Sequence, residues 1–175
     1  RGRYLEQRKD AAGAIGMYQQ ILLDPGLRAV QYAPDASGAA PASALAQQAI
    51  ARLIRQAGRE AYEPHDRAAA EQLAAARQSG DAQALLAVAQ SYPNAQVAPE
   101  AMLAAAEGFE NSGDHRAATR VLTQVYRKYR DAADMSSILE AQARNFLAMP
   151  DGLGVAVGRL AEAANLSAGK TLRRE

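Results

Sequence analysis

The sequence predicts an all-α protein built from antiparallel pairs of helices, and three observations support this prediction. Apolar residues recur at spacings of three and four through most of the chain, which is the period of an amphipathic helix. Alanine, the strongest helix former, supplies about a quarter of the residues. No segment alternates polar and apolar residues for long enough to form a convincing strand. We therefore expect about eight helices of roughly 10–18 residues each.

The first half of the chain contains three expected helices and one loop. The first apolar stripe stops at the turn signal Asp24–Pro25–Gly26, and it consists of Ala11, Ala14, Ile15, Tyr18, Ile21 and Leu22. Residues 33–42 contain two prolines, a glycine, an aspartate and a serine among alanines, which predicts a flexible loop. The second stripe runs to Pro64, which ends or kinks a helix, and it consists of Leu45, Ala49, Ile50, Leu53, Ile54, Ala57 and Ala61. A helix from about Pro64 to Ser79 follows.

The second half shows the same alternation of helix and tight turn. A short helix with Leu85, Leu86 and Ala89 closes at Tyr92–Pro93–Asn94, and the next begins at Pro99. The cleanest stripe then consists of Ala118, Val121, Leu122, Val125, Tyr126 and Tyr129. Two further helices are expected on either side of the turn at 149–152. Their predicted apolar residues are Met135, Ile138, Leu139, Phe146 and Leu147 in the first, and Leu153, Val157, Leu160, Ala161 and Ala164 in the second.

Turn signals recur at a nearly regular interval. Gly80–Asp81 and Gly113–Asp114 lie 33 residues apart, each between two amphipathic helices, and Lys9–Asp10 and Asp151–Gly152 occupy similar junctions. A period near 34 residues made of helix pairs is typical of tetratricopeptide (TPR) arrays. Such pairs must stack, because one pair cannot bury its own apolar face.

The stretch 99–131 resembles a TPR motif position by position. The matching residues are Ala106 at the close approach, Phe109 at the aromatic position, Gly113 in the turn, and Ala118, Leu122 and Val125 on the second helix. Arg130 stands where the family usually has Pro. Residues 4–25 look like the second half of another repeat. The resemblance implies an α-α superhelix (solenoid) of antiparallel pairs over a single domain, 1–175, that is irregular at 26–72.

Residues 73–94 resemble a shortened repeat, and the run 80–94 is similar to bacterial periplasmic TPR proteins of the Tol-Pal and outer-membrane-assembly type. That similarity implies a periplasmic location, while a cytoplasmic one stays open. A weaker similarity is to helical segments beside PQQ-type β-propeller repeats. The chain starts at Arg1 within an expected helix, so we expect a fragment of a longer protein.

Composition argues against several classes of function. The formal net charge of +1 gives no electrostatic footprint for nucleic acid. There are no cysteines, which excludes disulfides and thiolate sites. No apolar run approaches the roughly 20 residues that a membrane-spanning helix needs, so no direct membrane insertion is expected.

Four motifs suggest chemistry, but each has a simpler structural interpretation. Residues 164–171 match a relaxed P-loop pattern, and Gly152, Gly154 and Gly158 resemble a dinucleotide fingerprint. No strand is expected before either motif. We interpret the first as a helix C-cap at Gly169 and the second as a turn opening a closely packed helix. Glu63, His65 and Asp66 fit an ordinary helix start better than a metal site, and His115 is expected to be exposed. Tyr126 and Tyr129, interleaved with cations, are expected to pack on the next repeat.

These observations favour a non-catalytic module without cofactor or metal that binds a protein or peptide partner. The TPR resemblance implies that the groove of stacked first helices is the binding face, where the matching residues are Glu100, Leu103, Glu107, Glu110 and Asn111. Such a groove is acidic and favours a basic or polar extended segment. Two alternatives stay open: these residues form a solvated helix face, or the domain is a spacer that positions neighbouring domains of a longer protein.

Overall fold

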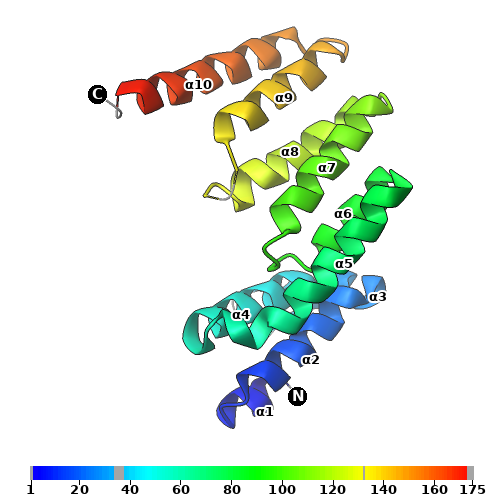
Figure 1. Ribbon diagram of the computed structural model, residues 1–175, viewed down its shortest axis with the longest axis vertical. Helices are drawn as coiled ribbons and strands as arrows, with labels where there is room; N and C mark the ends of the chain where they lie inside the picture. The colour runs from blue at the N-terminus through cyan, green and yellow to red at the C-terminus, as the bar shows by residue number, and fades with distance from the viewer. Residues whose placement is uncertain (1, 34–37, 132, 173–175) are drawn as a thin grey trace. The chain divides into compact units, whose positions relative to one another are not determined.

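The computed structural model describes residues 2–33, 38–131 and 133–172, with the side chains of residues 169–172 left out of the description. In this part of the chain the fold is all-α, as predicted, with ten α-helices, one 3-10 helix and one short two-stranded ribbon (Figure 1). The elements are α1 (Gly2–Gln7), α2 (Ala11–Leu23), α3 (Pro25–Ala29), β1 (Gln31–Tyr32), β2 (Ala40–Pro41), α4 (Ala42–Ala57), η1 (Arg59–Tyr62), α5 (Glu63–Ser79), α6 (Ala82–Ser91), α7 (Ala98–Asn111), α8 (His115–Lys128), α9 (Met135–Leu147) and α10 (Leu153–Leu172).

The chain packs into two compact units, which are described separately. Unit 1 contains the residues up to Ala75 together with Ala87–Ala98, and unit 2 contains Ala76–Leu86 and the residues from Pro99 onward. The expected number and length of the helices were wrong in detail, because α1 and α3 have six and five residues and α10 has twenty. No helix in the described residues is both long and apolar enough to cross a membrane.

The four predicted junctions between paired helices share one backbone conformation. The first residue of each junction has a positive φ, namely 60° at Lys9, 66° at Gly80, 80° at Gly113 and 60° at Asp151. The next residue is an aspartate at three of them. Its carboxylate accepts a backbone N–H of the following helix, from Gly13 at Asp10, from Gln83 at Asp81 and from Ala117 at Asp114. At these three junctions a left-handed residue ends one helix and a capping aspartate begins the next, whereas the junction at Asp151 shares only the left-handed residue.

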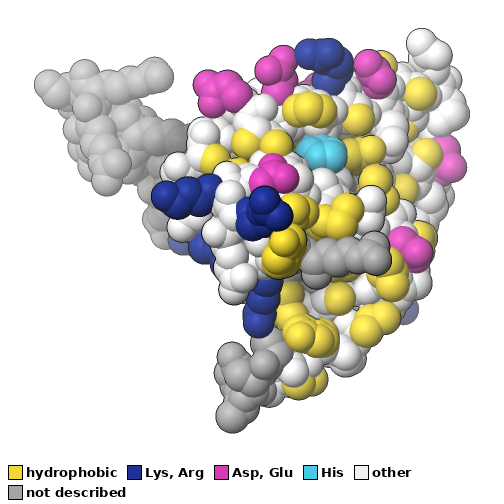
Figure 2. All heavy atoms as spheres, turned by 90° about the horizontal axis from the view of Figure 1, so that it is seen from below, with side chains coloured by type: hydrophobic (Ala, Val, Ile, Leu, Met, Phe, Trp, Pro, Cys, Tyr) yellow, Lys and Arg dark blue, Asp and Glu magenta, His cyan; other side chains and the backbone are white. Residues whose placement is uncertain are grey.

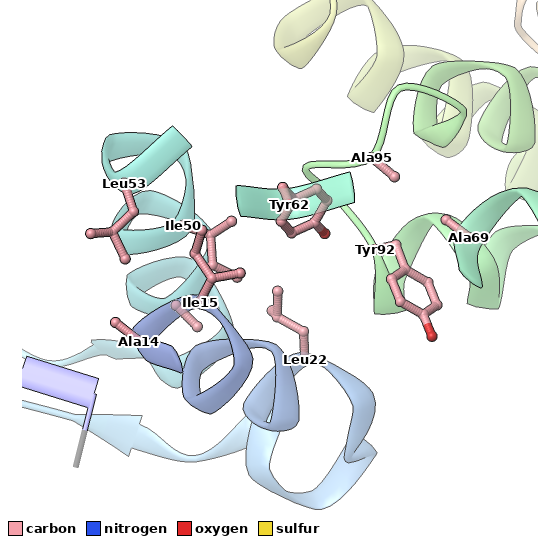
Figure 3. Packing of buried hydrophobic residues seen from close by; sticks show 10 residues of the cluster. Ala14, Ile15, Leu22, Ile50, Leu53, Tyr62, Ala69, Tyr92 and Ala95 are labelled. Carbon is pink, nitrogen blue, oxygen red and sulfur yellow. The ribbon is translucent and has the colours of Figure 1, made fainter. Parts of the chain in front are cut away.

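The core of unit 1 lies between α2, α4 and η1. Figure 3 shows Ile15 of α2 and Ile50 of α4 pointing toward each other, with Tyr62 of η1 beside them. A buried polar chain crosses this core. The hydroxyl of Tyr62 donates to Oε1 of Gln19 at 3.0 Å, and Nε2 of Gln19 donates to the carbonyl oxygen of Ser91 at 2.6 Å. Both side chains are fully buried, so their polar groups depend on these partners.

The middle of the chain departs from the paired pattern in two places. Helix α4 ends at Ala57, earlier than predicted, because Gly58 takes a φ of 93° and η1 follows. Pro64 lies instead in the first turn of α5, where a missing N–H costs nothing. The predicted loop at 33–42 falls partly outside the described residues, and on either side of that gap β1 and β2 pair antiparallel, Gln31 opposite Pro41 and Tyr32 opposite Ala40.

In unit 2 the pair α7 and α8 has the burial that the sequence predicted. The buried residues include Ala106, Phe109, Ala118, Leu122 and Val125.

The predicted core stripe of the last helix was wrong. Leu153 and Val157 are 66% and 58% exposed, and Leu160, Ala161 and Ala164 are exposed as well. The buried face of α10 carries Ala156 and Ala163 instead. Because α10 packs along α9, small side chains let the two backbones approach, and the larger residues are left on the outer face.

Candidate functional site

The predicted groove residues all lie on α7, in unit 2. Glu107 and Asn111 are exposed and Leu103 is half-buried. Glu100 is exposed too, but its carboxylate pairs with Nη2 of Arg77 on α5 at 2.6 Å. An arginine therefore balances the first of the three acidic groups on this face.

Glu110 belongs to a polar cluster that joins α7, α8 and α9. Its carboxylate accepts from Nε of Arg144 at 3.2 Å and from Nδ2 of Asn145 at 2.9 Å. Burial alone would raise the pKa of Glu110, but these hydrogen bonds and the charge of Arg144 outweigh it and hold the pKa below its usual value. His115, which was predicted to be exposed, is half-buried, and its Nδ1 lies 2.9 Å from Oδ1 of Asn145. Glu110 thus joins helices in this geometry, and Glu107 is the one of the three acids for which the described residues supply no ion pair.

The two glycine motifs lie at the start of α10 and within it. Residues 164–171 lie within α10, so their backbone N–H groups belong to a helix and form no phosphate-binding loop. The expected C-cap at Gly169 was wrong, because the helix continues to Leu172. The interpretation of Gly152 was confirmed: a Cβ at this position would overlap the carbonyl oxygen of Phe146, and α10 begins at the next residue.

The histidine near Pro64 lies among residues that already have partners. Asp66 forms a bidentate pair with Arg59 and also accepts from the backbone N–H of Gln96 at 3.0 Å. The ring of His65 lies against that of Tyr62, tilted by 47° with centroids 5.1 Å apart, and burial lowers the pKa of His65 despite the nearby Asp66. Within the described residues, no group of three His, Cys, Asp or Glu side chains could hold a metal ion.

Tyr126 contacts α10, the second helix after its own. Its hydroxyl donates to Oε1 of Glu162 on α10 at 2.5 Å, and Arg130 lies over its ring at 5.2 Å. Both the ring and the hydroxyl of Tyr126 therefore have contacts within unit 2.

Unit 1 contains a feature that the sequence did not predict, an open cavity of about 550 Å³. Residues of α1, α2, α3 and α4 surround it together with Val30 and Tyr32. The apolar lining consists of Met17, Tyr18, Ile21, Leu27, Val30, Tyr32, Ala42, Leu45, Ala46 and Ala49, and the remaining lining residues are Gly2, Arg3, Gln48 and Arg52. A concave surface of this size with a few polar groups is the usual form of a ligand site.

The short helix α3 leaves large apolar side chains in this lining in contact with solvent. Oδ1 of Asp24 accepts the backbone N–H groups of Gly26 and Leu27, so a new helix starts directly after α2 in a new direction. As a result Leu27 is 45% exposed, and Val30 and Tyr32 are about half exposed. Figure 2 shows one face of the molecule on which hydrophobic side chains gather beside those of Lys and Arg.

The polar edge of the cavity is organised around Glu6. Nη2 of Arg52 donates to Oε2 of Glu6 at 2.6 Å, and the hydroxyl of Tyr18 donates to Oε1 at 2.6 Å. Burial would raise the pKa of Glu6, yet these two donors and the charges of Arg52 and Arg3 lower it. Burial, together with the hydrogen bond to Glu6, raises the pKa of Tyr18 to about 12. Arg3, exposed in the same lining, forms no ion pair with any residue that the structure describes.

Sequence reasoning missed this cavity because its lining residues looked like core residues. Tyr18, Ile21, Leu45 and Ala49 were all assigned to apolar stripes, which identify a buried face without showing what covers it. The one available signal was the turn Asp24–Pro25–Gly26 followed by apolar residues that fit no repeat.

Comparison of the chain with protein-family models, curated proteins and solved structures gives no match.

Proposed function

We propose that this chain is a non-catalytic protein-binding module, built as a TPR-like array of helix pairs, and that unit 1 takes an apolar segment of a partner protein into its cavity. The observation that carries the proposal is the cavity of about 550 Å³ with Leu27, Val30 and Tyr32 half exposed in its lining. Exposed apolar residues grouped around a concave surface are typical of a recognition site.

A protein segment fits this site better than a small molecule. A small molecule inside the cavity would cover only the inward side of the half-exposed Leu27 and Tyr32, whereas an extended or helical segment can also cover the part of each side chain outside the cavity. The face of α7 with Glu107 is a second surface for the same function. It is less well supported, because Arg77 and Arg144 already balance the acids beside Glu107.

The test compares two leucines of equal exposure, one inside the cavity lining and one outside it. Leu27 and Leu23 are both 45% exposed, and only Leu27 lines the cavity. Random 12-residue peptides displayed on phage are selected on the wild-type protein, and the affinities of the strongest binders are measured by fluorescence polarisation. We expect Leu27→Asp to weaken binding at least tenfold and Leu23→Asp to leave it within twofold. Peptides that bind both variants equally well would show that the cavity is not the binding site.

A second candidate function is a spacer that positions neighbouring domains. The observation that favours it is the outer face of α10, where Leu153, Val157 and Leu160 are exposed. The test is hydroxyl-radical footprinting of these three side chains, in this chain alone and within a longer parent protein. Protection in the parent supports a docked domain, and equal oxidation in both contradicts it.

A further inference from the structure

The polar edge of the unit 1 cavity indicates what kind of segment it accepts. We propose that the partner segment is acidic, with a carboxylate next to its apolar anchor that pairs with Arg3. This inference rests on the proposed function, because it concerns the same cavity.

The charges at the cavity edge do not cancel. Arg3 and Arg52 both line it, and Glu6 is the carboxylate bonded to Arg52. Glu6 accepts from Arg52 and from Tyr18, so its charge is satisfied by two donors in the structure. The guanidinium of Arg3 is exposed and forms no ion pair with a described residue, although its charge acts on Glu6 from a distance. Two arginines therefore face one carboxylate, which leaves one positive charge at the edge unbalanced and open to a ligand.

This imbalance selects against a basic segment. A lysine or arginine side chain in the cavity would meet the like charges of Arg3 and Arg52, and it would have to compete with two existing donors for Glu6. A carboxylate, in contrast, finds a guanidinium with five donors in a fixed planar arrangement. Electrostatic complementarity of this kind decides which partner is accepted more than how tightly it is held.

The expected preference is modest because the edge is open to water. An exposed ion pair changes an equilibrium by about two- to fivefold at low salt, and less as added salt screens it. An aliphatic acid such as decanoate shares the carboxylate and the apolar chain. We favour a peptide because the half-exposed Leu27, Val30 and Tyr32 extend the apolar surface beyond what a single chain would cover.

The experiment uses three forms of the strongest peptide from the selection above, with identical apolar residues and with two flanking positions changed to Glu, Gln or Lys. Each is measured against wild-type protein, Arg3→Glu and Arg55→Glu. Arg55 is an exposed arginine on α4 outside the cavity lining, so its variant carries the same change in net charge. We expect the wild type and Arg55→Glu to bind the Glu peptide two- to fivefold tighter than the Gln peptide and the Lys peptide more weakly still. Arg3→Glu is expected to reverse this order.

The outcomes separate the two proposals. Equal affinities for the three peptides, each lost in Leu27→Asp, would overturn the acidic partner and keep the binding module. Affinities that Leu27→Asp does not change would overturn both. Displacement of the Glu peptide by micromolar decanoate would overturn the assignment to a protein segment.

Discussion

Removal of one hydroxyl from the core of unit 1 tests the structure most directly. In Tyr62→Phe, Oε1 of Gln19 loses the donor that now lies 3.0 Å away, and Gln19 is fully buried. A buried acceptor left without its partner costs about 1–3 kcal/mol, so we expect a loss of about 2 kcal/mol in the free energy of unfolding. In a unit of this size that corresponds to a fall of roughly 10 °C in Tm. The measurement is urea and thermal unfolding followed by circular dichroism at 222 nm.

The same unit offers a matched control. Tyr92 is also buried, and its hydroxyl accepts from Nε2 of Gln72 at 3.1 Å, but Gln72 is exposed and can bond to water instead. Tyr92→Phe is therefore expected to cost less than about 0.5 kcal/mol, as for most substitutions that leave no buried group unpaired.

A double variant tests the mechanism itself. Gln19→Met, which nearly keeps the side-chain volume, removes the acceptor, so adding Tyr62→Phe to it is expected to cost at least 1 kcal/mol less than Tyr62→Phe alone, at about the scale of a coupled pair. Equal losses for Tyr62→Phe and Tyr92→Phe, or additive effects in the double variant, would refute the buried polar chain.

Three further predictions concern the junctions and one ion pair. Lys9→Gly is expected to raise the free energy of unfolding by about 1 kcal/mol in urea melts, because Lys9 has a φ of 60° that glycine adopts without strain; a loss of stability would contradict this. Gly152→Ala is expected to lower the free energy of unfolding by about 1–3 kcal/mol, and with it the thermal midpoint, because the new Cβ would meet the carbonyl oxygen of Phe146. Gly154→Ala, which has open space around it, serves as the control. The folded-state pKa of Glu110 lies below its usual value, so its contribution is present at neutral pH and is lost as pH falls through the carboxyl range. Urea melts between pH 7 and pH 3 should then show a smaller acid-induced loss for Glu110→Gln than for wild type, and equal losses would be inconsistent with the polar cluster.

The parts of the fold that the sequence predicted well are those with local causes. Gly80–Asp81 and Gly113–Asp114 combine a residue suited to positive φ with a capping aspartate, so they mark a helix–turn–helix junction wherever they occur. Lys9 has no such backbone preference, and Asp151 has a weaker one than glycine. They were identified by their position between apolar stripes, and they adopt the same conformation because the packed helices on both sides require it.

The parts that the sequence did not predict depend on what each helix packs against. A stripe such as Leu153, Val157 and Leu160 shows that a helix has an apolar face, and the structure buries the alanine face next to it instead. The sequence does not show which of the two faces is buried, because hydrophobicity favours leucine in a core while close backbone approach favours alanine. The contact between α9 and α10 decides between these two effects.

The candidate site arises from the same dependence on tertiary contacts. Residues 26–72 match no repeat in the sequence, and α3, β1, β2 and α4 form most of this part of the chain. Here α3 is only five residues long and turns away after Asp24, so α2 and α4 keep an apolar cavity between them that solvent reaches. The cavity that we propose as the partner site is therefore bordered by α3 and β1, in the part of the chain that departs from the paired pattern.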